Sequence, residues 1–493
     1  MMRWRCLTAV SITVSLLCQS GCVGGGKSTV VVTDRDTDTV WVRVLLNAGS
    51  AYDPTGKEGL AFATATAVQW GYGSLARGTL TDRLAGLSAQ IDVWVDRAVC
   101  GFDGRCPRAA WPEFSELFVS LFAEPQVGNE GIAYIVADQL SALENLRSDD
   151  ARLARAVLQQ RLYGDHPWAH PPEGTDHSVL DLLPSDIRDF WSTHYVSSGL
   201  MLGLAGNISG SEAGRFRQSL TDVLPSGKTP RCEPPAAAVD GLQVAIIEMP
   251  GQDPRSLLVG CPTVIVRGDT DFPAFQLANA WLGRHGGRLT ELLDDKRDIS
   301  FVCWSYVEHT EPYVETDVLT SGRPRAAQCF FIETQPAPVN TAFILNIILA
   351  ELDELTARDI PTAGLDSARG YLAEHTRATA AHPAYRMGMQ LDARWLGLSG
   401  FTDGITGALE TTSAGDARRA VKRVVDPNNL VVVAVVPSGQ ALASQIMRHQ
   451  ISYSYPEGIN RLDLRSEDLV YLAYTPNWDP RKMRILGADE LFR

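Results

Sequence analysis

Two stretches that begin 230 residues apart decide the fold: DIRDFWSTHYVSSGL followed by MLGLA at 186–205, and DARRAVKRVVDPNNL followed by VVVAV at 416–435. Each has the pattern of a helix, a short turn and a buried strand, and each precedes a polar loop and another helix. The offset is the size of a domain and much longer than a solenoid repeat. The sequence therefore predicts two similar halves, each combining helices with a sheet.

The regions around these stretches support two halves. Strand-like runs at 30–33 and 40–46 are followed by amphipathic helical patterns at 109–123, 130–147 and 151–162. A proline- and alanine-rich segment then separates the halves. We expect a first domain at 29–224, a linker at 225–240, a second domain at 241–438, and a C-terminal tail at 439–493 that packs on the second domain.

The first 21 residues have the features of a targeting signal. A basic start (MMRWR) precedes an apolar run at 6–18 that is too short to span a bilayer as a mature helix. The run QSGC at 19–22 resembles the end of a bacterial lipoprotein signal, with Cys22 as the acylated residue; a plain secretory signal is the alternative. Because Val23 rather than Asp follows Cys22, the resemblance implies an outer-membrane protein facing the periplasm. No later stretch is apolar enough to span a membrane, so we expect membrane contact through the anchor only.

The glycine-rich segment after Cys22 is a decoy for nucleotide binding. Residues 21–28 (GCVGGGKS) fit the phosphate-loop pattern, but that loop needs a strand before it and a helix after it. We interpret residues 22–28 as a glycine spacer. The net charge is −14, and −16 once the leader with Arg3 and Arg5 is removed, which disfavours nucleic acid as a partner.

Four further fragments of the chain form an ordered set. They are GSAYDPTGKEGLA at 49–61; YGDHPW at 163–168 with EGT at 173–175; NAWLG at 279–283 with GRL at 287–289 and KR at 296–297; and the ending from Ile451-Ser452-Tyr453 to Glu490-Leu491-Phe492. In this order the fragments resemble segments of the insulinase (pitrilysin) family of zinc peptidases, in particular its processing-peptidase-like branch. The resemblance implies an α+β fold of two homologous domains, each a mixed, largely antiparallel sheet covered by helices.

The catalytic motif of that family is absent. An H-x-x-E-H helix normally follows G-L-A, with two histidines on zinc and the glutamate as general base. Here Phe62 and Thr66 occupy the histidine positions, and Ala65 occupies that of the base. The third ligand, a glutamate on a later helix, aligns with Leu143; a one-residue slip would restore Glu144, but one carboxylate does not hold zinc.

Other chemistry is not indicated. The Arg and Tyr with which the family holds its substrate align with Asp294 and Phe301, which reverse the charge and remove the hydroxyl. The one histidine pair spaced i, i+4, His166 and His170, contains Pro167 and belongs to a family loop. No CxxC pair, G-x-S-x-G elbow or catalytic cysteine frame is present. We therefore predict no metal, no cofactor and only vestigial site positions.

The resemblance implies a non-catalytic subunit that pairs with a zinc-bearing homologue, in a heterodimer whose chamber takes peptides or unfolded polypeptide. A stand-alone periplasmic scaffold or peptide-binding module is an alternative from another class, because a fold does not dictate a function. An active metalloendopeptidase with ligands elsewhere in the chain is the second alternative.

The positions of the cysteines suggest one candidate disulfide. Cys303 and Cys329 lie in strand-like runs at 299–306 and 326–334. If these runs pair antiparallel, the two sulfurs are candidate neighbours for a disulfide in an oxidising compartment. Two separate buried thiols are the other expectation.

Overall fold

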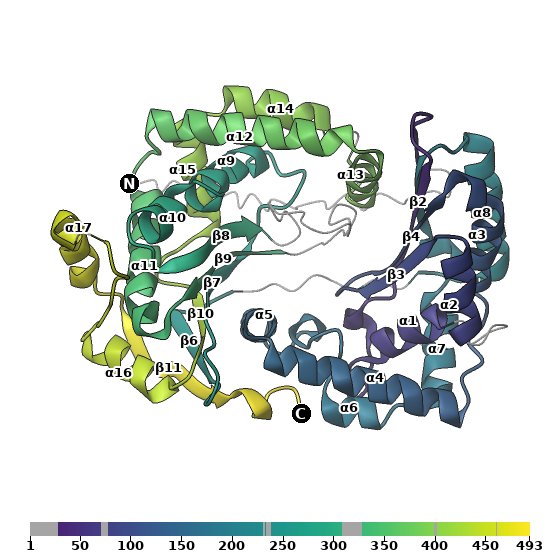
Figure 1. Cartoon of the computed structure of the whole chain (residues 1–493), viewed down its shortest axis with the longest axis horizontal. Coiled ribbons are helices and arrows are strands. Elements are labelled where there is room, and N and C mark those ends of the chain that lie inside the picture. Colours follow the sequence, from purple (N-terminus) through teal and green to yellow (C-terminus); the bar gives the residue numbers. More distant parts are fainter. Residues whose placement is uncertain are drawn as a thin grey trace, which may run out of the picture.

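The structure, a computed structural model, describes residues 28–70, 77–229, 232, 238–307, 328–398, 402–459 and 461–493. It consists of two mixed sheets, each covered by helices, and the two halves lie side by side (Figure 1). The predicted fold class is therefore confirmed. Cys22, the leader and nearly all of the glycine-rich decoy lie outside the described residues.

The first sheet has the strand order β1-β5-β2-β4-β3. Only β1 and β5 pair in parallel; the other pairs are antiparallel. Its strands are β1 (Thr29–Thr33), β2 (Thr39–Leu46), β3 (Gln90–Val95), β4 (Cys100–Pro107) and β5 (Met201–Gly206).

The second sheet repeats this order as β6-β10-β7-β9-β8 and adds β11 beside β6. Its β11–β6 and β6–β10 pairs are parallel, and the rest are antiparallel. Its strands are β6 (Leu242–Glu248), β7 (Ser256–Thr263), β8 (Ser300–Val307), β9 (Gln328–Pro336), β10 (Val431–Val436) and β11 (Trp478–Gly487).

The predicted internal repeat is confirmed by β5 and β10. Each lies between one parallel and one antiparallel neighbour, and every residue of both strands is buried. This burial accounts for their uninterrupted apolar sequences, which are typical of strands covered on both faces. Matching helices come before them, α7 (Pro184–His194) and α15 (Ala414–Val424), and after them, α8 (Gly210–Val223) and α16 (Gly439–Arg448).

The remaining helices follow the apolar periodicity of the sequence. Trp111, Phe114, Leu117 and Phe118 form the buried face of α3, as their helical spacing predicts. In the first half lie α1 (Leu60–Gln69), α2 (Arg77–Gly86), α3 (Trp111–Ser120), α4 (Asn129–Ser148), α5 (Asp150–Tyr163) and α6 (Asp176–Leu180). In the second half lie α9 (Phe272–Gly283), α10 (Arg288–Thr290), a π-helix (Glu291–Asp295), α11 (Thr341–Ala357), α12 (Thr362–Ala381), α13 (Pro383–Trp395), α14 (Thr402–Thr411) and α17 (Arg461–Ala473).

Two helices at matching places in the halves each cover the sheet of the other half. Helix α5 packs on β7 and β10 of the second sheet, and α13 packs on β1 and β5 of the first. Leu158 of α5 lies against Gly260 of β7, while Leu391 of α13 lies against Gly203 of β5. The halves therefore share their cores, although the chain order suggests two separate units.

The end of the chain returns to the first half. The carbonyl oxygen of Phe492 accepts a hydrogen bond from the backbone N–H of Asp176 at 3.0 Å. The same carbonyl and that of Leu491 accept from Arg147 of α4. Among the described residues, no helix is both long and apolar enough to cross a membrane.

The candidate disulfide between Cys303 and Cys329 is wrong. Strands β8 and β9 do pair antiparallel, but Cys303 lies opposite Thr334, five positions along β9 from Cys329. The two thiols also point to opposite faces of the sheet, into different cores. Cys303 and Cys329 are therefore two separate buried thiols, which was the alternative expected from the sequence.

Candidate functional site

Helix α1 carries Phe62, Ala65 and Thr66, the positions that the resemblance aligns with the family's zinc motif. Phe62, Thr66 and Gln69 form a partly exposed stripe at i, i+4 and i+7, whereas Ala65 is buried. Side chains at i and i+4 lie one above the other on a helix, so positions 62 and 66 have the relative placement that two metal ligands need. A phenyl ring and a threonine side chain occupy them instead.

The third position lies on α4, which packs against α1. Leu143 is completely buried in the core that α4 and α5 share with the second sheet. Its neighbour Glu144 points outward, with 74% of its side chain exposed, and pairs with Arg147 at 3.3 Å. A one-residue slip of the alignment therefore does not bring a carboxylate to α1.

Zinc does not fit these positions. Its usual protein ligands are imidazole, thiolate and carboxylate groups, and Phe62, Ala65, Thr66 and Leu143 supply none of them. Across the described part of the chain, no group of three or more His, Cys, Asp or Glu side chains is placed to hold a metal ion.

The start of α1 is built around Asp53. Its carboxylate is fully buried and accepts hydrogen bonds from the backbone N–H groups of Gly59 and Ala61, both at 2.7 Å. These N–H groups would otherwise lack partners at the start of the helix. Burial raises the pKa of Asp53 well above its ordinary value, although the two N–H donors lower it.

A second loop closes on the same helix end. Gln139 of α4 donates from Nε2 to the carbonyl oxygens of Gly59 and Glu173, at 2.9 and 2.8 Å. Gly174 has a φ of 84°, and a Cβ there would lie 2.1 Å from the carbonyl oxygen of Glu58. The fragments at 49–61 and 163–175 are thus brought into direct contact.

His166 and His170 have separate partners in this loop. His166 Nδ1 accepts from the backbone N–H of Trp168 at 3.2 Å, while His170 Nδ1 lies 2.9 Å from the carbonyl oxygen of Pro171. His170 Nε2 is 3.9 Å from Asp53. Burial lowers the pKa of His170, against the effect of the Pro171 carbonyl. Both histidines therefore make contacts within this loop.

The two positions that the resemblance aligns with the family's substrate-holding residues lie in the second half. Asp294 is in the π-helix, and Phe301 is in β8. Partial burial first, and then the charges of Asp295 and Asp298, raise the pKa of Asp294. This acidic turn is the reverse of the positive charge that the family uses to grip a peptide.

The fragment at 296–297 meets the tail of the chain. The fully buried Arg297 donates to Glu467 and Asp468 of α17, at 2.7 and 2.9 Å. Tyr455 also donates to Asp468, at 2.6 Å. The resemblance in the tail therefore reflects a structural contact inside the second half.

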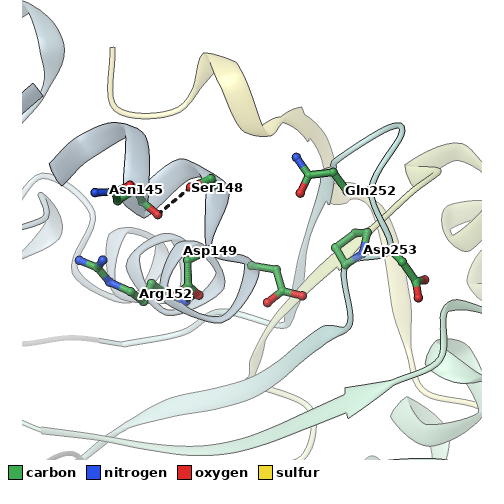
Figure 2. A pocket seen from close by; sticks show the side chains of 8 residues that line it. Asn145, Ser148, Asp149, Arg152, Gln252 and Asp253 are labelled. Atoms are coloured by element: carbon green, nitrogen blue, oxygen red, sulfur yellow. Dashed lines mark hydrogen bonds between the residues drawn. The ribbon is translucent and has the colours of Figure 1, made fainter. Parts of the chain in front are cut away.

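The described residues contain a polar groove of about 580 Å³ between the α4–α5 turn and the β6–β7 loop (Figure 2). Its charged groups already have partners. Asp149 caps α5 through the N–H of Arg152, Asp150 accepts from the N–H of Arg255, and Arg152 pairs with Glu173. The groove includes none of the α1 positions and lies at the seam between the halves.

Sequence reasoning missed Asp53, Gln139 and Gly174, which shape the start of α1. Asp53 had no N-cap signal, because it lies six positions before the N-cap residue, Gly59. Gln139 had none, because its partners are 80 and 34 residues away along the chain.

Comparisons with known proteins agree with this architecture. Residues 182–372 match a family model described as "Peptidase M16 inactive domain". Three solved structures share the fold. A peptidase M16 inactive domain from Pseudomonas fluorescens is 21% identical, with 84% of this chain and 97% of that chain covered and a TM-score of 0.73. A protease from Helicobacter pylori is 16% identical, with 83% and 96% covered and a TM-score of 0.70.

The third is a chain of complex III2 from Candida albicans, 14% identical, with 83% of this chain and 93% of that chain covered and a TM-score of 0.65. A search of curated protein sequences finds no match. The matched segment and the shared fold together support the resemblance to the M16, or insulinase, family.

Proposed function

We propose that this chain is a non-catalytic insulinase-family subunit that pairs with a zinc-bearing homologue. The observation that carries the proposal is the stripe on α1, where Phe62 and Thr66 occupy the ligand positions and buried Ala65 replaces the base. The helix and its supporting loop are intact, so the scaffold of a zinc site is retained without its chemistry.

The shared cores suit the chain to act as a rigid half of a larger assembly. Because α5 and α13 each cover the sheet of the opposite half, the two halves are fixed in position relative to one another. Such a unit shapes a chamber wall and selects peptides or unfolded polypeptide by size, while a partner supplies hydrolysis. Acylation at Cys22 would keep the assembly at the periplasmic face of the outer membrane.

Co-expression with a homologue that retains H-x-x-E-H tests this proposal. We expect a stable heterodimer on size exclusion, and cleavage of a fluorogenic peptide that is at least tenfold faster than with either chain alone. The control is a homologue with its catalytic Glu replaced by Gln, which should still assemble but should not cleave.

Two results would overturn the proposal. In one, the homologue cleaves equally well alone and never co-elutes, which leaves a free-standing scaffold or peptide-binding module. In the other, the purified chain cleaves peptide by itself in a chelator-sensitive way.

A further inference from the structure

Asp53 and His170 form a buried pair of titratable groups that the proposed function does not use. The carboxylate of Asp53 is completely buried, and the side chain of His170 is 15% exposed. Oδ2 of Asp53 lies 3.9 Å from Nε2 of His170. Asp53 belongs to the segment at 49–61 and His170 to the segment at 163–175, so the pair connects two distant parts of the chain at the start of α1.

The carbonyl of Pro171 fixes which nitrogen of His170 carries the proton of the neutral ring. Nδ1 lies 2.9 Å from this carbonyl oxygen, and a carbonyl oxygen only accepts, so Nδ1 is the donor. Nε2 of the neutral ring is then an acceptor that faces the carboxylate of Asp53. When Asp53 is ionised and His170 is neutral, two acceptors face each other at a place largely shielded from water, which is unfavourable.

One proton between the two groups removes this conflict. On Asp53 it makes an O–H that donates to Nε2, and on His170 it makes an N–H that donates to the carboxylate. In either form a movement of about 1 Å brings the two atoms from 3.9 Å to hydrogen-bonding distance. The oxygens of Asp53 remain acceptors for the backbone N–H groups of Gly59 and Ala61.

The surroundings of the pair shift the two pKa values in opposite directions. Burial first, opposed by the two backbone N–H groups and reinforced by the charge of Glu58, raises the pKa of Asp53. Burial first lowers the pKa of His170; nearby backbone groups and Glu58 raise it, and the charge of Arg97 lowers it. A carboxylate that keeps its proton beside a histidine that stays neutral is one of the two forms with a single proton.

Other charged groups on the segments packed around the pair already have partners. Lys57, beside Glu58, pairs with Asp186 of α7 at 3.0 Å. Glu173 pairs with Arg152 of α5 at 3.1 Å. Helix α4 packs here through the neutral amide of Gln139. Glu58 and Arg97 are therefore the charges that act on the pair, and they act in opposite directions on His170.

We propose that Asp53 and His170 share one proton and form a pH-sensitive latch that holds the segment at 163–175 against the start of α1. The proton comes from solvent. Its release at higher pH leaves two acceptors facing each other, and uptake of a second proton in acid leaves a second buried cation beside Arg97. Both changes favour separation of the two segments. The latch goes beyond the proposed function and needs no partner subunit.

The pH range follows from the ordinary pKa values of the two groups. When the segments are apart, Asp53 and His170 titrate near about 4 and about 6.5, so the separated pair holds one proton between these values. The latched pair keeps that proton above pH 6.5 and does not take up a second one below pH 4. Separation therefore releases a proton at high pH and binds one in acid, so the latch weakens in both directions, by up to about tenfold per pH unit.

NMR of the full chain with 15N-labelled histidine tests the shared proton. We expect His170 to show the Nδ1–H form and no transition near pH 6.5, where exposed His177 should titrate. The Nε2 signal should change at higher pH, when the shared proton leaves. This step should be absent in Asp53→Asn, whose side-chain N–H donates to Nε2 at every pH. A His170 that titrates near pH 6.5, both in the wild type and in Asp53→Asn, would overturn the proposal.

Hydrogen exchange followed by mass spectrometry measures the latch itself. Protection of the backbone N–H groups at 163–175, corrected for the intrinsic exchange rate, should be greatest between about pH 4 and pH 6.5 and should fall on either side. His170→Gln should remove this pH dependence. His177→Gln, in adjacent helix α6, is the matched control and should retain it. The same pH profile in His170→Gln as in the wild type would contradict the latch, whatever the overall stability of the variant.

Discussion

Arg155 of α5 donates to Glu333 of β9 across 2.9 Å and thereby joins a helix of the first half to the sheet of the second. Tyr306 of β8 donates to the same carboxylate at 2.6 Å. Glu333 is only 7% exposed, so its carboxylate is largely shielded from water where it connects the two halves. The contact ties the two halves together, and its contribution to stability can be measured.

Glu333→Gln should lower the free energy of unfolding by about 1–3 kcal/mol, because Arg155 loses its carboxylate partner at a mostly buried place. Glu354→Gln is the matched control, since Glu354 pairs with Arg358 on an exposed helix face; it should cost less than about 0.5 kcal/mol. Urea unfolding of both variants provides the comparison. Equal losses would mean that the crossing ion pair contributes little.

Leu158→Ala and Leu391→Ala should each cost about 2–5 kcal/mol, because both leucines are fully buried under crossing helices. Since the halves share cores, fluorescence and circular dichroism should report one coincident transition in each variant. Leu469→Ala, at a position 57% exposed, is the control and should change stability by less than about 0.5 kcal/mol. Two separated transitions would show that the halves unfold independently.

We expect the wild-type chain to bind no stoichiometric zinc and to show no peptidase activity. Replacing Phe62 and Thr66 together by His should create a weak zinc site, because the stripe on α1 places them one above the other. Phe62→His alone is the control and should not bind. Metal analysis after dialysis measures this; tight zinc in the wild type, or none in the double variant, would contradict the assigned positions.

Gly174→Ala should destabilise the loop that closes on α1. The new Cβ would lie 2.1 Å from the Glu58 carbonyl oxygen, at a φ of 84° that side chains disfavour. Gly214→Ala is a control with the opposite sign: nothing lies within 4 Å, and alanine in helix α8 should stabilise by about 0.5–1 kcal/mol. Thermal unfolding of both variants measures these changes in stability. A Gly174→Ala variant as stable as the wild type would show that the loop accommodates the new side chain.

His194 should make stability fall in mild acid. The ring packs against Phe190 at 4.3 Å, and burial lowers its pKa from 6.5 to about 4. The unfolded chain therefore binds more protons between these values, so the stabilisation is present above pH 6.5 and is lost as pH falls toward 4, by about 2–3 kcal/mol.

Urea unfolding across this pH range checks the effect of His194. His194→Gln should flatten the pH dependence, whereas His177→Gln, at an exposed histidine, should leave it unchanged. An identical slope in His194→Gln would assign the acid sensitivity to other groups.

The sequence by itself determined the repeat, most helices and strands, and the absence of zinc-ligand chemistry on α1. These depend on residue type and short-range periodicity: alternation, helical spacing and an unbroken apolar run each specify a local structure whatever lies further along the chain. Helix α1 likewise has no His, Cys, Asp or Glu, whatever the fold around it.

Only the tertiary structure decided that α5 and α13 each cover the sheet of the opposite half, and that Gln139 closes the start of α1. It also separated Cys303 from Cys329, because strand register depends on how the whole sheet packs. Each of these contacts joins residues distant in the chain. Their energy comes from burial and charge between surfaces that local patterns do not specify, so they become visible only once the chain is folded.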